Sequence, residues 1–316
     1  MASLYDFPMK ARLYFITVSS IAFAAFFNCD AQEEKKPPVK NPDPLRIIAF
    51  GAHPDDAEFQ AGGCATKWAA LGHKVKLVSV TNGDIGHWKE AGGPLAKRRT
   101  AEVQEAAKRG GWEVEVLDIH DGEIMPTLEN RKTIARLIRD WDADLVLCHR
   151  PHDYHPDHRN AGLLVRDAAF MVKVPFYVPD TPPIKHSIVF CYFPDRFTVP
   201  YPFEADIAVS IDEAFEDKLN AIDALESQVY EGGALANEKT PIKRFASDPE
   251  RRKNFLRKSW QNRHGNIANR YRDALVKWYG EEKGNAVKYA EAFEICEYAD
   301  QPSEDRIREL FPFFGE

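Results

Sequence analysis

The sequence predicts an α/β domain built on a doubly wound, Rossmann-like sheet of mostly parallel strands, followed by a helical C-terminal extension. The first observation behind this prediction is that short apolar runs alternate with helical patterns from residue 45 onward, which is typical of βαβ units. The second is that the pattern becomes mainly helical from about residue 213. With 316 residues, of which 44% are hydrophobic, the chain can bury a sizeable core. We therefore expect one domain over residues 45–316 and not two independent ones.

The N-terminal segment has the features of a secretory signal peptide over residues 1–31. Basic residues, with Met9 as an alternative start, precede an uncharged stretch from 13 to 27 and a small-residue cleavage site at Ala31. The apolar stretch is short for a membrane span. We expect a soluble product exported to the periplasm or the extracellular space, without a membrane span. A lipid anchor on Cys29 is the alternative, although the residues before it fit the lipidation pattern poorly.

Residues 32–44, with the sequence QEEKKPPVKNPDP, are charged and proline-rich, which predicts a linker. The strands expected after this linker lie at 45–51, 73–81, 112–119, 143–149, 186–193 and 205–212. The helices expected among them lie at about 59–71, 95–109, 127–140 and 159–171. In a doubly wound sheet with the strand order 3-2-1-4-5, the first and fourth strands are neighbours and a crevice opens at their carboxyl ends.

Charge and cysteine content narrow the class of protein. The formal net charge of −7 argues against nucleic acid as the main partner, because phosphate binding requires a basic face. None of the four cysteines after the signal peptide has a C-x-x-C spacing typical of metal or redox sites. Cys148 lies in the apolar run DLVLCH and is expected to be a small buried side chain. Export would permit a disulfide, but the sequence does not pair the cysteines.

Two short segments gather acidic and imidazole side chains at predicted strand ends. The first, GAHPDDAEFQAGG at 51–63, follows the first strand, and the second, CHRPHDYHPDHRNAG at 148–162, closes the fourth. Because these strands are neighbours in the predicted sheet, the two segments should meet at the crevice. The first segment alone could be a turn, with Asp56 capping the next helix. The matched pair instead favours a functional site.

A divalent metal ion is the simplest group that such a crevice would hold. Mixed histidine and aspartate ligation suits zinc, and catalytic zinc sites keep three protein ligands and an open position for water. His53 and Asp56 can supply two ligands across the strand-to-helix turn, and a histidine of the second segment can supply the third. Asp55 would remain free to take a proton from the activated water. We expect one Zn²⁺ per chain, with another divalent metal as the alternative.

The two motifs, AHPDD and HPDH, resemble those of the LmbE-like (PIG-L) zinc deacetylase family. That family includes N-acetylglucosaminyl-phosphatidylinositol de-N-acetylases and the deacetylases of mycothiol and bacillithiol synthesis. Further matches in the same order are GG at 62–63, TNGD at 81–84 and RTAE at 99–102. The resemblance covers most of residues 45–212. It implies the doubly wound LmbE-like fold and suggests a small homo-oligomer.

The resemblance also implies roles for individual residues. The implied metal ligands are His53, Asp56 and His158. Asp55 would be the general base, which activates water and later protonates the departing amine. His155 would help to stabilise the oxyanion. Arg99 would reach the site from the helix after the second strand and contact substrate, and the alternative is a plain arginine on the surface of that helix.

Several neighbouring residues keep more than one interpretation. His149 and His152 are expected to lie around the ligands or on the surface, and either Asp153 or Asp157 could orient a ligand imidazole. Asp153 also stands where some family members have a tyrosine, so the resemblance does not imply a tyrosine contribution at the oxyanion. For Glu58 the default is a charge interaction with the helix N-terminus. The glycine-rich loop 83–97, which contains His87 and Trp88, could be a lid, a sugar-stacking loop or an ordinary exposed loop.

Together these features predict an exported zinc-dependent hydrolase that removes an N-acetyl group from an amino sugar or glycoconjugate. Amide hydrolysis requires an activated nucleophile, charge stabilisation at the carbonyl oxygen and a proton for the amine, and the predicted side chains supply these functions. The expected partner is an N-acetylated small molecule or glycan. The alternatives are a metal-dependent amidase for another amide and a catalytically silent carbohydrate-binding protein.

Overall fold

The computed structural model describes residues 44–238 and 248–315. The predicted signal peptide, and the predicted linker except for its last residue, lie outside the described residues. Of the helices in the described part of the chain, none combines the length and the apolar character needed to cross a membrane.

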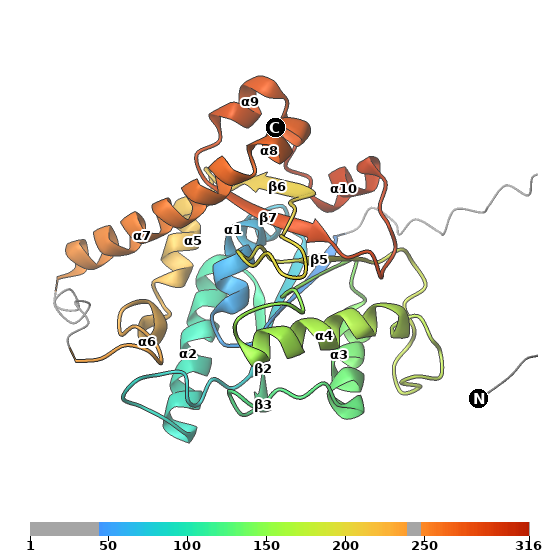
Figure 1. The fold of residues 1–316 in the computed structure, drawn as a ribbon, viewed down its shortest axis with the longest axis horizontal. Coiled ribbons are helices and arrows are strands. Elements are labelled where there is room, and N and C mark those ends of the chain that lie inside the picture. The colour runs from blue at the N-terminus through green and yellow to red at the C-terminus, as the bar shows by residue number, and fades with distance from the viewer. Residues whose placement is uncertain (1–43, 239–247, 316) are drawn as a thin grey trace, which may run out of the picture. The chain divides into compact units, whose positions relative to one another are not determined.

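A seven-stranded sheet forms the centre of the domain (Figure 1). The strands are β1 (Arg46–Gly51), β2 (Lys74–Thr81), β3 (Glu113–Ile119), β4 (Leu145–Cys148), β5 (Val189–Tyr192), β6 (Ile207–Ser210) and β7 (Ala290–Ile295). Their order in the sheet is β3-β2-β1-β4-β5-β7-β6. The first five strands pair in parallel, and β7 is antiparallel to both β5 and β6. The predicted order of the first five strands is confirmed.

Helices cover both faces of this sheet (Figure 1). The helices before the C-terminal region are α1 (Asp56–Ala70), α2 (Gly93–Gly110), α3 (Leu128–Trp141) and α4 (Pro156–Met171). The helices of the C-terminal region are α5 (Phe215–Ile222), α6 (Glu226–Val229), α7 (Pro249–Arg270), α8 (Arg272–Tyr279), α9 (Glu281–Ala286) and α10 (Glu304–Leu310). The predicted helices therefore form between the strands where the apolar pattern placed them.

Two apolar clusters lie on the two faces of the sheet. β1 contributes to both because its side chains alternate: Ile47 and Ala49 belong to one cluster, and Ile48 and Phe50 belong to the other. Side chains of α1, α2, α5 and α7 pack in the first cluster, and those of α3 and α4 pack in the second. β1 is thus held rigidly at the middle of the sheet, with its carboxyl end fixed.

The C-terminal region is mainly helical, as predicted, but it also contains β7, which was not expected. This strand has the sequence AEAFEI, and alanine and glutamate are strong helix formers. Tertiary contacts override that propensity: the Glu291 side chain is completely buried and forms an ion pair with Lys218. β7 therefore inserts between β5 and β6, which the alternation of elements along the chain does not reveal.

Glu291 also connects β7 to the middle of α1. Its carboxylate accepts hydrogen bonds from the backbone N–H groups of Gly63 and Cys64 at 2.8 and 2.7 Å, while Lys218 Nζ donates to the Phe59 carbonyl at 2.9 Å. A Cβ atom at Gly63 would lie only 2.9 Å from Glu291 Oε1. The second glycine of the GG pair is therefore required by this buried contact, which anchors the helix that begins at Asp56.

Candidate active site

The two histidine- and aspartate-rich segments meet at the carboxyl ends of neighbouring strands, as the sequence predicts. β1 and β4 pair in parallel with Phe50 opposite Cys148. The first segment turns directly into α1, and the second leads into α4. In a doubly wound sheet this edge is where ligands bind.

Three side-chain atoms from these segments form a compact triangle. His53 Nδ1 lies 3.2 Å from Asp56 Oδ2 and 3.3 Å from His158 Nε2, and the distance from His158 Nε2 to Asp56 Oδ2 is 3.4 Å. Ligands at about 2.0–2.1 Å from a tetrahedral zinc ion are separated from one another by roughly 3.3–3.4 Å. The structure therefore brings together the three residues expected as ligands, at separations that fit a zinc-sized cation.

Carboxylates lie behind both imidazoles of this triangle. His53 Nε2 is 3.1 Å from Asp121 Oδ1 and 3.3 Å from Asp157 Oδ2, and His158 Nδ1 is 3.0 Å from Asp153 Oδ1. Carboxylates in this position fix the tautomer and the orientation of metal-binding imidazoles. The sequence left open whether Asp153 or Asp157 would do this, and the structure places each of them behind a different histidine.

Asp121 is a residue of the site that the sequence analysis missed. It follows β3, so it reaches the same sheet edge from a third parallel strand. Its backbone N–H donates to Asp84 Oδ1 at 3.1 Å, and His120 Nδ1 lies 2.7 Å from Asp84 Oδ2. An acidic residue at the carboxyl end of a predicted parallel strand is the signal that could have identified it.

Two further histidines lie against the triangle. The ring of His149 stacks on that of His158 at 4.2 Å, and its Nε2 is 3.3 Å from Asp56 Oδ2. The same nitrogen also accepts the backbone N–H of Ala52 at 3.3 Å, so its lone pair is already engaged. His149 is therefore a buried neighbour of the triangle, and burial lowers its pKa.

His155 approaches from the other side. Its ring lies edge-on to that of His53 with centroids 4.6 Å apart, and its Nδ1 accepts the backbone N–H of Asp157 at 3.2 Å as the N-cap of α4. With Nδ1 as an acceptor, the neutral ring carries its proton on Nε2. His155, His53 and His158 together are one of several overlapping groups of described side chains near enough to one another to hold a metal ion.

The adjacent aspartates of the first motif have different surroundings. Burial alone would raise the pKa of Asp56, but the neighbouring imidazoles, first those of His158 and His149, hold it well below its ordinary value. Burial raises the pKa of Asp55, and Arg99 opposes this effect, with Nη2 at 3.3 Å from Asp55 Oδ2. Each negative charge therefore has its own compensating partner. Asp56 also accepts the backbone N–H of His53 at 2.8 Å, but it does not cap α1, because Asp55 occupies the N-cap position and no side chain caps the helix there.

Arg99 is not a surface residue, so that alternative is wrong. Only 2% of it is exposed, and its guanidinium donates to the carbonyl oxygens of Gly83 and Pro54 at 3.1 and 3.3 Å. Gly83 has φ +68°, and a Cβ atom there would lie 2.6 Å from Arg99 Nη1. The start of the glycine-rich loop thus makes room for a buried guanidinium, and contact between Arg99 and substrate stays a prediction.

The rest of the loop 83–97 is tied to the segment around α6. The backbone N–H of Trp88 donates to the Gly233 carbonyl at 2.9 Å, and His87 Nε2 lies 3.0 Å from Glu231 Oε2. His87 Nδ1 accepts two backbone N–H groups, so Nε2 carries the proton of the neutral ring. His87 is buried, so this part of the loop does not match an ordinary exposed loop.

Glu58 also differs from its expectation. It is 3% exposed, and burial raises its pKa to about 8. A favourable interaction with the helix N-terminus requires an ionised carboxylate. Burial therefore opposes the ionised form that the expected charge interaction requires at this residue.

Comparisons with known proteins identify the family of this chain. The PIG-L family model, described as GlcNAc-PI de-N-acetylase, matches residues 48–169, a range that contains both motifs. Diacetylchitobiose deacetylase of Thermococcus kodakarensis is 30% identical over 200 residues, which are 60% of this chain and 72% of that protein.

Solved structures are similar in fold. N,N'-diacetylchitobiose deacetylase from Pyrococcus horikoshii has a TM-score of 0.61 at 24% identity and covers 85% of this chain and 91% of its own. The 4-carboxy-2-hydroxymuconate hydratase of Pseudomonas putida has the same TM-score of 0.61 at 18% identity, over 82% of this chain and 99% of its own. Since the fold is shared with a hydratase, fold alone does not assign a reaction. The sequence similarity does assign a family: this chain belongs to the PIG-L family of LmbE-like de-N-acetylases.

Proposed function

We propose that the protein is a zinc-dependent hydrolase that removes the acetyl group from an N-acetylated amino sugar or glycoconjugate. Family membership supports the reaction class. The observation that carries the proposal is the triangle of His53 Nδ1, Asp56 Oδ2 and His158 Nε2, with sides of 3.2–3.4 Å, beside the separate carboxylate of Asp55. The Asp56 carboxylate can thus bind the metal while the neighbouring Asp55 carboxylate accepts and donates the proton.

The donor set favours zinc among the common divalent ions. Two imidazole nitrogens and one carboxylate oxygen are typical of catalytic zinc sites, whereas magnesium and calcium prefer sets made of oxygens. A cation held there would polarise the acetyl carbonyl and provide an activated nucleophile at neutral pH. The carboxylates behind His53 and His158 would keep both rings in the orientation that presents the correct nitrogen.

Asp55 is the proposed acid and base of the reaction. Its carboxylate would take a proton from the attacking water and later give it to the amine nitrogen that leaves. Arg99 holds Asp55 from the side, since its Nη2 lies 3.3 Å from Asp55 Oδ2. His155 would donate from Nε2 to the developing oxyanion, and it can do so as a neutral ring because Nδ1 already accepts the Asp157 N–H.

Export to the periplasm or the extracellular space is part of the same proposal. It rests on the signal-peptide pattern of residues 1–31. Cell fractionation of the full-length chain would test it, because a cleaved product should appear outside the cytoplasm. Cys29→Ser separates the two routes: a lipid-anchored product would lose its membrane association, whereas a soluble exported product would be unchanged.

The central test is release of acetate from N-acetylated sugars by the purified, metal-loaded protein. N,N'-diacetylchitobiose is a suitable first substrate within a panel that also contains unrelated amides. Asp55→Asn should retain zinc but lose activity by about a hundredfold or more, whereas His158→Ala should lose zinc as well. A control such as Arg251→Ala, whose side chain is 70% exposed, should behave like the unchanged protein.

Other outcomes would identify the alternatives. Cleavage of unrelated amides without cleavage of acetylated sugars would make the protein a general amidase. Sugar binding without acetate release by the zinc-loaded protein would make it a silent carbohydrate-binding protein. Absence of a stoichiometric divalent ion after reconstitution would overturn the mechanism.

A further inference from the structure

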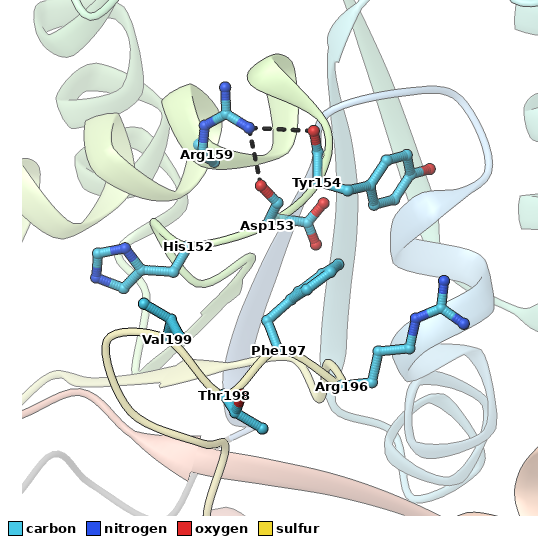
Figure 2. Close-up of a pocket in the computed structure, with 8 residues that line it drawn as sticks. All are labelled: His152, Asp153, Tyr154, Arg159, Arg196, Phe197, Thr198 and Val199. Atoms are coloured by element: carbon cyan, nitrogen blue, oxygen red, sulfur yellow. Dashed lines mark hydrogen bonds between the residues drawn. The ribbon is translucent and has the colours of Figure 1, made fainter.

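A cavity of about 420 Å³ opens beside the candidate metal triangle. Figure 2 shows the side chains that line this cavity. Two of its lining residues connect it to the triangle. Asp153 Oδ1 is 3.0 Å from His158 Nδ1, and the ring of Tyr154 lies 5.5 Å from that of His158. A molecule whose acetyl group reached the triangle would therefore extend its remaining part into or across this cavity.

The opposite wall of the cavity is held by a buried arginine. The Arg150 side chain is completely buried, and its Nη1 donates to the Asp195 carboxylate at 3.2 Å. Its Nη2 donates to the Tyr201 carbonyl at 2.9 Å, and its guanidinium also lies 4.6 Å from the centre of the Tyr201 ring. The segment between these two anchors, which contains Arg196 and Phe197, is thus tied to the loop that carries the site.

Aromatic rings from both walls face the cavity. Tyr154 is 68% exposed, although it lies against the buried His158 and the half-buried His155, and its ring centre is 6.3 Å from that of Phe197. Figure 2 shows that the side chains of Tyr154 and Arg196 extend on the same side of the cavity. An exposed ring beside a site is available to pack on the apolar face of a sugar.

The charges that line the cavity are predominantly positive. Among the described residues Arg196 is exposed and has no hydrogen-bond or ion-pair partner. Arg159 is also exposed and uses its Nη1 to bond the carbonyl oxygens of Asp153 and Tyr154 at 2.8 and 3.1 Å (Figure 2). The carboxylate of Asp153 is already occupied by His158 and by the backbone N–H of His155.

Two more arginines continue this positive lining. Arg263 and Arg270 line a smaller cavity of about 160 Å³, which begins at Pro194 and Asp195, directly before Arg196 in the chain. The carboxylate of Asp195 is engaged by Arg150. The chain as a whole has a net charge of −7, so this concentration of arginines around the two cavities is a local feature that the overall composition does not explain.

We propose that the larger cavity binds an anionic substituent of the N-acetylated substrate, with Arg196 as its main contact and Arg159 as a second cationic group. The substituent would be a carboxylate or a phosphate ester, because arginine binds the oxygens of both with charge-assisted hydrogen bonds. Tyr154 and Phe197 would pack on the sugar ring. This inference rests on the proposed function, whose substrate it narrows to acidic glycans and glycoconjugates.

Binding to zinc-loaded Asp55→Asn protein, measured by calorimetry, tests the proposal without turnover. Three probes are compared: neutral N,N'-diacetylchitobiose, a disaccharide of N-acetylglucosamine and glucuronic acid, and N-acetylglucosamine 6-phosphate. At least one acidic probe should bind about tenfold more tightly than the neutral one, as expected for one charge-assisted contact. The preferred acidic probe distinguishes a carboxylate from a phosphate.

Variants at Arg196 assign the effect, because this exposed side chain can change without disturbing the core. Arg196→Ala should remove the preference for the acidic probe, Arg196→Glu should reverse it, and Arg196→Lys should retain part of it. Affinity for the neutral probe should change by less than about twofold, since its binding involves no charge contact. Arg251→Ala is the matched control at an exposed arginine remote from the cavity.

The outcomes separate this inference from the proposed function. Equal affinity for all three probes, or an equal loss for neutral and acidic probes in Arg196→Ala, would overturn the anionic subsite. If the unchanged enzyme still released acetate from the neutral disaccharide, the proposed function would hold even though the anionic subsite was disproved. Conversely, Arg196-dependent binding of an acidic probe without any acetate release would retain the subsite and overturn the deacetylase proposal.

Discussion

Arg99 bridges Asp55 and Asp121, with its Nη2 at 3.3 Å from Asp55 Oδ2 and its Nη1 at 3.6 Å from Asp121 Oδ2. Asp121 in turn lies 3.1 Å from His53 Nε2. One buried guanidinium therefore connects the proposed proton-transfer group to the carboxylate that orients a proposed metal ligand. This arrangement places Arg99 behind the reacting groups, where it can fix their positions.

Replacing Arg99 should reduce catalysis more than metal binding. In Arg99→Met, the buried Asp55 carboxylate would lose the guanidinium that compensates its charge and fixes its orientation. We expect kcat to fall by roughly 10- to 100-fold, as for other residues that orient a catalytic group, and the free energy of unfolding to fall as well. Steady-state kinetics, zinc titration and thermal unfolding measure these three effects.

The matched control for this change is Arg109→Met on the same helix, where the arginine forms an exposed pair with Glu105. It should leave kcat unchanged. If Arg99→Met raised KM while kcat stayed constant, the arginine would contact substrate and would not act through Asp55. Partial recovery in Arg99→Lys would support a role of the charge itself.

The carboxylates behind the imidazoles should control metal affinity. Asp153→Ala removes the oxygen that lies 3.0 Å from His158 Nδ1, so that ring would lose its fixed tautomer. Zinc affinity should fall by about 10- to 100-fold, as is usual for carboxylates in this position. Competition with a chromophoric chelator measures it directly.

Asp167→Ala is a control for the loss of a carboxylate in the same part of the chain. Asp167 lies on α4 and forms partly exposed ion pairs with Arg131 and Arg166. Zinc affinity in that variant should be unchanged. If Asp153→Ala bound zinc as tightly as the unchanged protein, His158 would not need this carboxylate in order to bind metal.

The order of the first five strands and the meeting of the two motifs could be predicted because both depend on local signals. Apolar runs locate the strands, and the rules for parallel sheets then place residues 53–56 beside residues 149–158. Asp121 could not be assigned in this way. Its position after a predicted strand places it at the same sheet edge, but only its contacts with Arg99 and His53, which are distant in the chain, distinguish it from other acidic residues there.

β7 could not be predicted for a related reason. Its Glu291 is completely buried, which is stable only because Lys218, 73 residues earlier, supplies the opposite charge. A sequence reading treats such a glutamate as exposed and as favourable to helix. A long-range ion pair therefore stabilises the one strand of the described C-terminal region that local patterns do not reveal.

The close approach of Glu291 to α1 predicts a large difference between adjacent glycines. A Cβ atom at Gly63 would lie 2.8 Å from Ile211 Cγ2 and 2.9 Å from Glu291 Oε1, whereas a Cβ atom at Gly62 would lie 3.7 Å from its nearest neighbour, Lys218 Cε. Gly63→Ala should therefore lower the free energy of unfolding by about 1–3 kcal/mol through overpacking. Gly62→Ala should be neutral or stabilising, because alanine favours a helix.

Denaturant unfolding of the two variants provides the comparison. If the two variants had the same free energy of unfolding, β7 and α1 could move apart to accommodate a methyl group at residue 63 without loss of stability. Because α1 begins with Asp56, we also expect Gly63→Ala to weaken zinc binding, and Gly62→Ala to leave it unchanged.

Acid should weaken the packing of α7 on β7 through His264. This side chain is completely buried, its Nδ1 donates to the Ala290 carbonyl at 2.9 Å, and its Nε2 has no hydrogen-bond partner among the described residues. Burial, followed by the nearby charge of Lys218, holds its pKa well below the ordinary value. The folded protein therefore contains the neutral ring, and protonation would place an unpaired charge in the core.

The sign of the pH effect follows from this depressed pKa. Below a pH of about 6.5 the unfolded chain binds a proton at His264 that the folded chain does not, so stability falls as pH decreases from there toward the folded pKa. The loss from this one group can reach about 1.4 kcal/mol for each pH unit in that window. His264→Gln removes the titration while keeping a donor for Ala290, so it should show a smaller loss of stability between pH 7.5 and pH 5.5 in denaturant unfolding at matched zinc occupancy. Identical pH dependence in the two proteins would mean that His264 is protonated in the folded state and that α7 accommodates the charge.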